Sequence, residues 1–434
     1  MAKHASDITL KSQLELVVGC SCVVVGGSSL TSLSSKGEVE KHHFYPTSVE
    51  EYINGIVDAA LQYGRLEKSK PGVLMVAAPG AFQNEGTIAC LPPNFHRVQE
   101  DARQRGMPNL FFRSLVEEEL QKRGFDQVKA YGYNDAVPAL VATLTQPNTE
   151  EVLTEFEEEL ASKERSDYAV AYMINGTGTG EAAIYPDSHR IVTAEKGHLK
   201  PNFLWYELNP FFKYITRLPI VGQNRSIERL IAGGPHRREI RHFTKILNAV
   251  LDLLVLEEHP DQAGLVRALG YPSIGALRKA DTPSGLLKIH LTQKKEASNL
   301  GIGHLSDGIK SNSDLAVRLR NIFARAVGSA FAYMHFAIGE MPDTPLNTFI
   351  GPNDIRCSAL GFIRSDGSTT ALLGGDPKVW EILEHGAQDY SKAMLDGTPH
   401  LFRVKEINHT FPDIHPDFGG LPALAAAKLE KFRK

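Results

Sequence analysis

Cysteine is scarce in this chain, with only four among 434 residues. That number is too small for the disulfide framework of a secreted protein, and Cys20-Ser-Cys22 lies in an apolar stretch far from the other two. Val17-Val18-Gly19-Cys20 has the pattern of a lipoprotein cleavage site, but Glu15 interrupts an apolar stretch already too short for a signal peptide. We therefore expect a cytoplasmic protein.

Long apolar runs and a strong net charge are also absent. No run approaches the roughly 20 apolar residues that are needed to span a bilayer. The formal net charge of -4 gives no broad attraction for nucleic acid or anionic lipid, and the local basic stretch at 237–241 is typical of a solvated helix face. We expect neither a nucleic-acid partner nor a membrane partner.

The length and the order of the predicted elements indicate an α/β protein with two or three domains. Alternating strands and helices favour sheets flanked by helices over a helical bundle or a β-sandwich. The predicted elements are strands at 14–25 and 30–33, a helix at 49–63, a strand at 72–78, a helix at 110–123, a strand at 127–132, helices at 136–143 and 150–163, a strand at 168–174, a helix-rich stretch at 205–300, a helix at 313–338, and a strand at 369–373 before another helix.

A glycine-rich turn, Asn175-Gly176-Thr177-Gly178-Thr179-Gly180, follows the predicted strand at 168–174. Alternating glycines let backbone amides face an anion without interference from Cβ atoms, so the turn has the composition of a phosphate loop. The alternative is an ordinary tight hairpin.

Fifteen residues after Gly180 comes Glu195-Lys196-Gly197-His198. Glu195 and His198 can bracket adjacent hydroxyls of a sugar, and Gly197 leaves room for a ligand beside the backbone. The alternative is a surface ion pair of Glu195 with a neighbouring lysine beside a solvated histidine. No third ligand stands at a recognisable metal spacing, so we predict no zinc site.

Asp135 directly follows a strand and precedes a helix of small residues. A carboxylate in that place can accept a proton from a substrate hydroxyl, which Asn134 could orient. The alternative role for Asp135 is to cap the helix.

Three further segments have the composition of binding loops. Asn94 ends a segment that follows Pro79-Gly80 and could bind a polyol, or it could be an exposed residue of a plain hairpin. Gly374-Gly375 and the C-terminal stretch at 417–427 join glycines to helix starts, which suits a nucleotide.

The order of these motifs resembles the ROK and bacterial glucokinase sugar kinases of the hexokinase, actin and Hsp70-like superfamily. The resemblance covers about residues 14–200 and 305–434. It implies an α/β fold of two ribonuclease-H-like lobes, the actin-like ATPase fold, with a cleft between them and a helical insertion in the second lobe. We expect residues 1–143 and 418–434 in the N-terminal lobe and 144–417 in the C-terminal lobe, with 205–300 as the helical elaboration.

The resemblance also implies roles for individual residues and the cofactors ATP and Mg²⁺. Asp135 would be the general base on a sugar hydroxyl. The sugar would be bound by Asn94, Asn134, Glu195, His198 and Glu228, the last within a stretch at 226–234 that is similar to a glucokinase segment. The nucleotide would contact Gly26, Gly27 and Ser28 of the first hairpin, Gly176, Thr177, Gly178 and Thr179 of the glycine-rich turn, and Gly374 and Gly375 near the adenosine.

The chain departs from the family pattern in two places. The first hairpin of these kinases reads Asp-x-Gly-Gly-Thr, and its aspartate helps to hold Mg²⁺ and the phosphates, whereas Val24 stands at the matching position here. The clustered cysteines of the zinc motif common in ROK proteins are also missing, which favours the glucokinase-like branch. No DNA-binding extension precedes the first hairpin, so we do not expect a transcriptional repressor.

Two hypotheses follow. The first is an ATP- and Mg²⁺-dependent kinase of glucose or a related sugar; the second is a catalytically impaired sugar- or nucleotide-binding descendant, which Val24 favours. An actin-like filament protein or a chaperone ATPase is disfavoured, because Glu-x-Gly-His has no evident role there. The elaboration at 205–300 is compatible with a homodimer interface and equally with a self-contained helical layer.

Overall fold

The computed structural model divides the chain into two compact units, one of residues 1–155, 191–194 and 408–434 and the other of residues 156–190 and 195–407. The residues described are 16–26, 29–34, 36–80, 82–83, 87–88, 95–144, 154, 158, 170–175, 179–185, 190–194, 197, 199–217, 226–232, 242–256, 258–281, 285–295, 302–336, 362–366, 377–394, 403–406 and 417–433.

A five-stranded sheet of order β3-β2-β1-β4-β7 forms the centre of the first unit. The first three strands pair antiparallel, and β1, β4 and β7 run parallel. The parallel strands β1 and β4 are nearly continuous apolar runs, as expected for strands covered on both faces. The strands are β1 (Cys20–Val25), β2 (Ser29–Leu33), β3 (Val39–His43), β4 (Gly72–Ala78) and β7 (Val128–Asn134), and β5 (Phe82–Gln83) pairs with β6 (Thr87–Ile88) in a separate hairpin.

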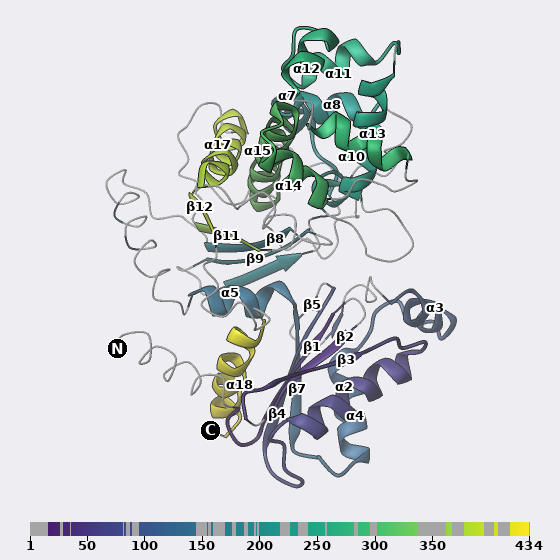
Figure 1. The fold of residues 1–434 in the computed structure, drawn as a ribbon. Helices are drawn as coiled ribbons and strands as arrows, with labels where there is room; N and C mark the ends of the chain where they lie inside the picture. Colours follow the sequence, from purple (N-terminus) through teal and green to yellow (C-terminus); the bar gives the residue numbers. More distant parts are fainter. Residues whose placement is uncertain are drawn as a thin grey trace. The chain divides into compact units, whose positions relative to one another are not determined.

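Helices cover this sheet on opposite faces (Figure 1). Val23 and Val25 of β1 belong to the core cluster that also contains the inner residues of α2 (Val49–Tyr63), α3 (His96–Gln104) and α4 (Phe112–Lys122). Because side chains alternate along a strand, Val24 points to the other face. That face is packed by α5 (Ala136–Leu144) and α18 (Asp417–Arg433).

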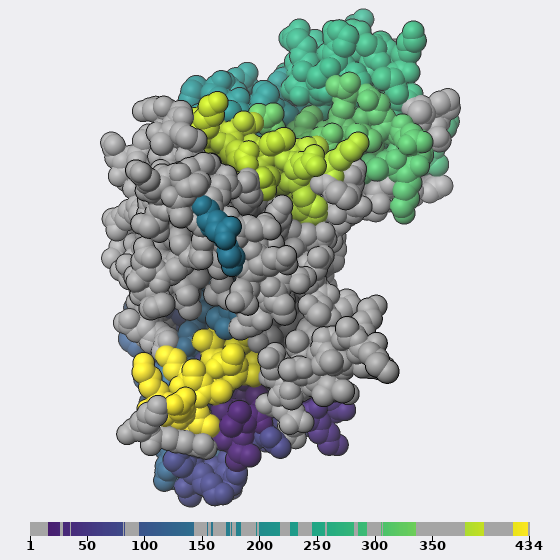
Figure 2. Space-filling model, turned by 90° about the vertical axis from the view of Figure 1, so that its left-hand side faces the viewer, coloured from purple at the N-terminus to yellow at the C-terminus, as the bar shows by residue number. Residues whose placement is uncertain are grey.

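The C-terminal helix α18 contacts α5, β1 and β4 of the first unit, and its outer side is visible in yellow in Figure 2. Leu421, Ala425 and Leu429 form its buried stripe at four-residue spacing. A Cβ at Gly420 would lie 1.9 Å from the carbonyl oxygen of Pro138 in α5. The glycine of this terminal motif therefore allows two helix backbones to touch, rather than leaving space for a ligand.

A second five-stranded sheet has the order β10-β9-β8-β11-β12, which repeats the strand order of the first, and apart from residues 191–194 of β10 its strands belong to the second unit. The β8–β9 pair is antiparallel, and β8, β11 and β12 run parallel. The strands are β8 (Val170–Asn175), β9 (Thr179–Tyr185), β10 (Arg190–Ala194), β11 (Phe362–Asp366) and β12 (Arg403–Glu406).

The helices α15 (Asp314–Phe336) and α17 (Pro377–Met394) of this unit pack against each other. A Cβ at Gly328 would lie 1.9 Å from the carbonyl oxygen of Leu383, and one at Gly386 would lie 2.3 Å from that of Arg325. The two glycines face each other's helix backbone, so no side chain separates the helices.

The helical part of the second unit packs against α15. Asp281 and Ser313 join it to the start of that helix, because Ser313 Oγ donates to Asp281 Oδ1 at 2.5 Å while accepting from the amides of Leu286 and Ala316. Its helices are α7 (Phe203–Leu208), α8 (Pro210–Ile215), α9 (Ile227–Ile231), α10 (His242–Val255), α11 (Gln262–Ala268), α12 (Ile274–Ala280), α13 (Leu286–Lys295) and α14 (Ile302–Lys310). No helix of the described residues is both long and apolar enough to cross a membrane.

The strand order confirms the predicted fold class, two ribonuclease-H-like α/β units with a helical insertion in the second. Two predicted details differ from the structure. β1 begins at Cys20, not near residue 14, because Gly19 with φ 90° sits in a turn. β3 was not predicted, since its sequence VEKHH is polar. The strand predicted at 369–373 and most of the helix predicted at 150–163 lie outside the described residues.

The carboxylate of Asp101 makes the stability of the first unit depend on pH. Asp101 of α3 accepts a hydrogen bond from the amide of Val49 at the start of α2, with an N–O distance of 2.8 Å. That bond is the main reason why the pKa of the Asp101 carboxyl lies below its ordinary value. The Asp101 carboxyl therefore binds a proton more readily in the unfolded chain than in the folded one. The stability that ionised Asp101 contributes is present above the unfolded pKa of about 3.9, and it is lost as the pH falls through the lower pKa of the folded state.

We expect Asp101→Ala to lower the free energy of unfolding at pH 7 and to have a shrinking effect as the pH is lowered from about 5. Urea unfolding between pH 7 and pH 3 measures this difference. Glu100→Ala, which removes an exposed carboxylate of the same helix, is the control. Parallel pH curves for wild type and Asp101→Ala would contradict the assignment.

Candidate functional site

Five of the predicted site residues are among those described: Gly26, Asn134, Asp135, Thr179 and Glu228. The others lie outside the described residues, and their roles stay predictions: Gly27, Ser28, Asn94, Gly176, Thr177, Gly178, Glu195, His198, Gly374 and Gly375. The described residues form two groups, one in each unit.

In the first unit, three polar turns gather at one edge of the sheet. β1, β4 and β7 are parallel and in register, with Val24 opposite Ala77 and Ala78 opposite Asn134. Their carboxyl ends therefore meet, which is where open α/β sheets bind ligands. This edge carries the turn at Gly26, the turn Pro79-Gly80 and the pair Asn134-Asp135.

Asn134 fixes the geometry of this edge. Its side chain is 5% exposed, its Nδ2 donates to the carbonyl oxygen of Gly80 at 3.0 Å, and its Oδ1 accepts from the amide of Ala136 at 3.0 Å. Gly80 has φ 126°, a conformation that favours glycine. Asn134 thus ties the end of β7 to the turn after β4 and accepts a hydrogen bond from the first amide of α5.

Asp135 stands between β7 and α5 and is partly exposed. The start of α5 adds the positive end of a helix dipole to the same edge. A carboxylate in this place is open to a substrate, while the bonds of its neighbour Asn134 hold the backbone on either side of it. The arrangement suits a proton acceptor that has to stay in one position.

Val24 leaves the first hairpin without a carboxylate. It is 3% exposed and lies between Thr31 of β2 and Ala77 of β4. Its neighbours in the sheet are an apolar strand and a buried threonine. The side chain at this position is therefore part of the sheet packing and supplies no ligand for a metal ion.

In the second unit, the ends of the β8–β9 hairpin are held by buried side chains. Asn175, fully buried, stands opposite Thr179 across the hairpin and accepts a hydrogen bond from its Oγ1 at 3.1 Å. The Nδ2 of Asn175 donates to the carbonyl oxygen of Ile231 at 3.3 Å. These bonds fix both ends of the glycine-rich turn at 176–178.

The two motifs that the sequence separates by fifteen residues touch in the structure. Gly197 lies against the hairpin, because a Cβ at this position would come within 2.3 Å of the carbonyl oxygen of Thr179. From the other direction, Glu228 Oε2 accepts from the amide of Thr179 at 3.3 Å. Gly197, the described residue of the 195–198 motif, and the predicted sugar ligand Glu228 thus both contact Thr179.

A buried ionisable pair beside this hairpin was not predicted from the sequence. Glu181 of β9 and His335 of α15 are both fully buried, with 3.5 Å between Glu181 Oε1 and His335 Nδ1. Glu181 lies two residues after Thr179 and so faces the same side of the sheet. Nothing in a single strand sequence indicates that a glutamate has an inward-facing partner on a distant helix.

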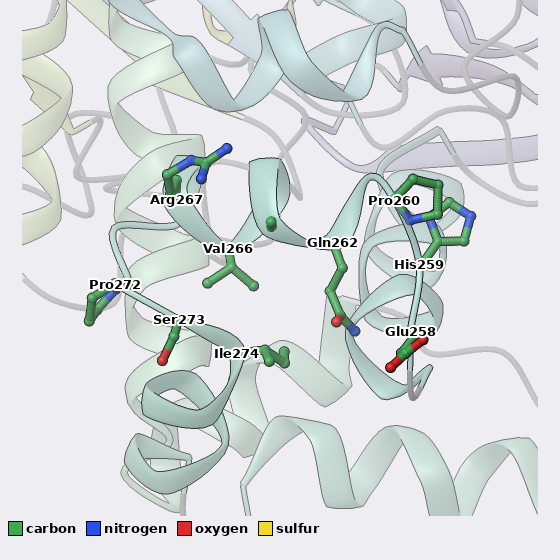
Figure 3. A pocket seen from close by; sticks show the side chains of 10 residues that line it. Glu258, His259, Pro260, Gln262, Val266, Arg267, Pro272, Ser273 and Ile274 are labelled. Carbon is green, nitrogen blue, oxygen red and sulfur yellow. The ribbon is translucent and has the colours of Figure 1, made fainter.

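A separate cavity of about 710 Å³ lies in the helical part of the second unit (Figure 3). Figure 3 shows Glu258, His259 and Gln262 on one side of it and Arg267 and Pro272 on the other. None of the predicted site residues lines this cavity. Within the part of the chain that the structure describes, no group of three or more histidine, cysteine, aspartate or glutamate side chains is arranged to hold a metal ion.

No protein-family model and no curated protein matches this chain. Solved structures match it over nearly its whole length. They include a ROK hexokinase from Thermus thermophilus (15% identity, 96% of this chain and 99% of that one, TM-score 0.47) and a ROK family glucokinase from Streptomyces griseus in complex with glucose and AMPPNP (14%, 93% and 98%, 0.43). A glucokinase from Balamuthia mandrillaris in complex with glucose matches at 13% identity, over 97% and 99%, with a TM-score of 0.49.

These structures are sugar kinases of the kind that the order of motifs resembles. With identities of 13–15% and TM-scores of 0.43–0.49, the similarity assigns neither a substrate nor an activity to this chain. The fold assignment rests on the strand order of the two sheets.

The contact between Gly197 and Thr179 can be tested by adding one methyl group. Gly197→Ala puts a Cβ against backbone, which cannot move aside as a side-chain end can, so we expect a loss of about 2 kcal/mol or more in the free energy of unfolding. Gly275→Ala is the matched control, because a Cβ there meets only Ser273 Oγ at 3.8 Å inside α12. The control substitution should leave stability unchanged or raise it by up to about 1 kcal/mol. Equal effects of the two substitutions, measured by urea unfolding, would contradict the contact.

Proposed function

We propose that this protein phosphorylates a hexose, glucose or a related sugar, at the expense of ATP. The observation that carries the proposal is the contact between Gly197, within the motif predicted to bind sugar hydroxyls, and Thr179, within the motif predicted to bind phosphate. The second support is Asp135, a partly exposed carboxylate at the sheet edge of the first unit where ligands bind in α/β folds.

In this proposal, Asp135 accepts the proton of the attacking sugar hydroxyl as its oxygen bonds to the γ-phosphorus of ATP and ADP leaves. Asn134 holds the backbone around Asp135 through its bonds to Gly80 and Ala136. Glu195 and His198 bind hydroxyls of the sugar. Glu228, which accepts a hydrogen bond from the amide of Thr179, adds a carboxylate to these sugar ligands next to the β8–β9 hairpin.

The predicted site residues are better suited to bind the phosphates of ATP than to coordinate a magnesium ion through protein side chains. The glycine-rich turn has both ends fixed by Asn175 and Thr179, as a phosphate-binding turn requires. Mg²⁺ bound with ATP takes many of its ligands from phosphate oxygens and water. A requirement for the ion is therefore compatible with a first hairpin that has Val24 in place of a carboxylate. When bound, the ion would neutralise charge on the phosphates.

A second candidate is a sugar- or nucleotide-binding protein with impaired catalysis. The observation that favours it is Val24, a buried apolar side chain where kinases of this type carry an aspartate. Both candidates bind a ligand of the same class, but only the kinase converts it to product at a normal rate. A cytoplasmic location and a homodimer through residues 205–300 remain predictions under either candidate.

The kinase proposal is tested by ATP consumption in a coupled assay with a panel of hexoses, N-acetylhexosamines and phosphorylated sugars. We expect a hexose to stimulate turnover and Asp135→Asn to lower kcat by about 10²-fold or more, the usual contribution of a general base, with sugar affinity nearly unchanged. Asp126→Asn is the matched control, since Asp126 is an exposed aspartate just before the opposite end of β7.

Three results would decide against the kinase. Turnover that no sugar stimulates, or an Asp135→Asn variant as active as wild type, contradicts the proposal. Sugar binding by calorimetry without turnover assigns the protein to the second candidate.

A further inference from the structure

The sheet of the first unit ends in two outer strands, β3 and β7. Each of them pairs with a single neighbour in the sheet, so one side of its backbone has no adjacent strand. An open edge of this kind can add a strand from another molecule unless charges or covering side chains prevent it. The two edges of this sheet are protected in different ways.

The sequence of β3, VEKHH, protects that edge through its charges. When two copies of one strand pair antiparallel, facing residues must direct their N–H and C=O groups the same way, so one residue faces its own copy. The register of full overlap places Lys41 opposite Lys41, and a neighbouring register places Glu40 opposite Glu40. Like charges directly opposite each other are destabilising, so β3 disfavours pairing with itself.

The sequence of β7, VKAYGYN, has no such protection. In the register centred on Ala130, Lys129 faces Tyr131 of the other copy. Val128 faces Gly132 in the same register, so no like charges meet. A lysine beside a tyrosine ring is attractive. The side chains of β7 therefore favour the pairing that those of β3 oppose.

Two side chains of α4 occupy the backbone groups of β7 that an added strand would use. The amide of Ala130 donates to Glu117 Oε1 at 3.0 Å, and Arg113 Nε donates to the carbonyl oxygen of Ala130 at 2.8 Å. Arg113 Nε also lies 3.7 Å from Glu117 Oε1. The pair thus offers Ala130 one acceptor and one donor, as a neighbouring strand would.

The same two side chains extend across the edge from one face of the sheet to the other. Ala130 belongs to the core cluster beneath α2 and α4, so Lys129 and Tyr131 lie on the opposite face. Glu117 Oε2 is 3.5 Å from Lys129 Nζ. The guanidinium carbon of Arg113 is 4.4 Å from the ring centroid of Tyr131. Arg113 and Glu117 therefore cover the edge as well as bonding to it.

We propose that Arg113 and Glu117 close the edge of β7 to strand addition, and that the strand they exclude is β7 of a second copy of this chain. The side chain of Arg113 is 37% exposed and that of Glu117 is 18% exposed, so the edge that they cover lies at the surface of the first unit. The inference does not depend on the proposed function.

The test is the double variant Arg113→Ala with Glu117→Ala, which frees both backbone groups of Ala130. In sedimentation velocity we expect an assembly of about twice the mass of wild type or more, in a share that rises with protein concentration. Adding Tyr131→Lys to the double variant places a lysine opposite Lys129 in the register centred on Ala130. This third substitution should restore the wild-type mass.

The matched control is Arg123→Ala with Glu119→Ala, which removes an arginine–glutamate pair from the end of the same helix. Its bonds join the two residues to each other and Arg123 to Asp58 of α2. The control should keep the wild-type mass.

Binding of a fluorescent peptide of residues 127–134 gives a second readout, which does not require the protein to self-associate. We expect the double variant to bind it about tenfold or more tightly than wild type and the control, because two backbone hydrogen bonds become available. Fluorescence anisotropy measures the affinity.

A double variant that keeps the wild-type mass and binds the peptide no more tightly than wild type would overturn the inference. A larger assembly that persists after Tyr131→Lys would show that β7 is not the added strand. If circular dichroism shows the double variant to be unfolded, Glu117→Ala alone frees the amide of Ala130, and the same two measurements decide.

Discussion

The contact between the backbones of α15 and α17 is the constraint on which the second unit depends. Gly328 and Gly386 each face a carbonyl group of the other helix, so the distance between the helices is set by main-chain atoms. This fixed distance brings the rings of Tyr333 and Tyr390 together. From the last turns of α15, Tyr333 reaches the segment after the predicted sugar turn and His335 reaches Glu181 of β9. The end of α15 therefore contacts both the backbone at Lys200 and the β8–β9 hairpin.

The two sheets share a strand order but use it differently. In the first unit, the polar groups follow β7, and Asn134 joins that strand end to the turn after β4. In the second unit, the polar groups lie on the β8–β9 hairpin, where Asn175 and Thr179 pair with each other. A buried asparagine stabilises each site because its amide both donates and accepts, and can therefore bond to two backbone or side-chain groups at a turn.

Much of the fold was predictable from the sequence, and the contacts of the site were less so. Apolar runs such as 72–78 and helical spacing such as 49–63 are local signals, and the structure confirms them as β4 and α2. The polar strand β3 was missed, because its residues face solvent and its place depends on pairing with β2. The contact of Gly197 with Thr179 and the pairing of Glu181 with His335 join distant parts of the chain, which no local pattern indicates. Ten predicted site residues, Glu195 and His198 among them, still have only the sequence as their basis.

In the proposed kinase, Val24 would affect the rate of phosphoryl transfer more than the affinity for the nucleotide. An aspartate at the first hairpin would bind a magnesium ion, but it would also repel phosphate whenever no ion is bound. The buried valine removes both effects. In the proposed kinase it would therefore raise the free energy of the transition state, where a metal ion would neutralise developing charge, more than it would weaken the binding of a nucleotide. The hairpin at Asn175 and Thr179 then becomes more important for holding phosphate, and its fixed ends are a structural reason why it can do so.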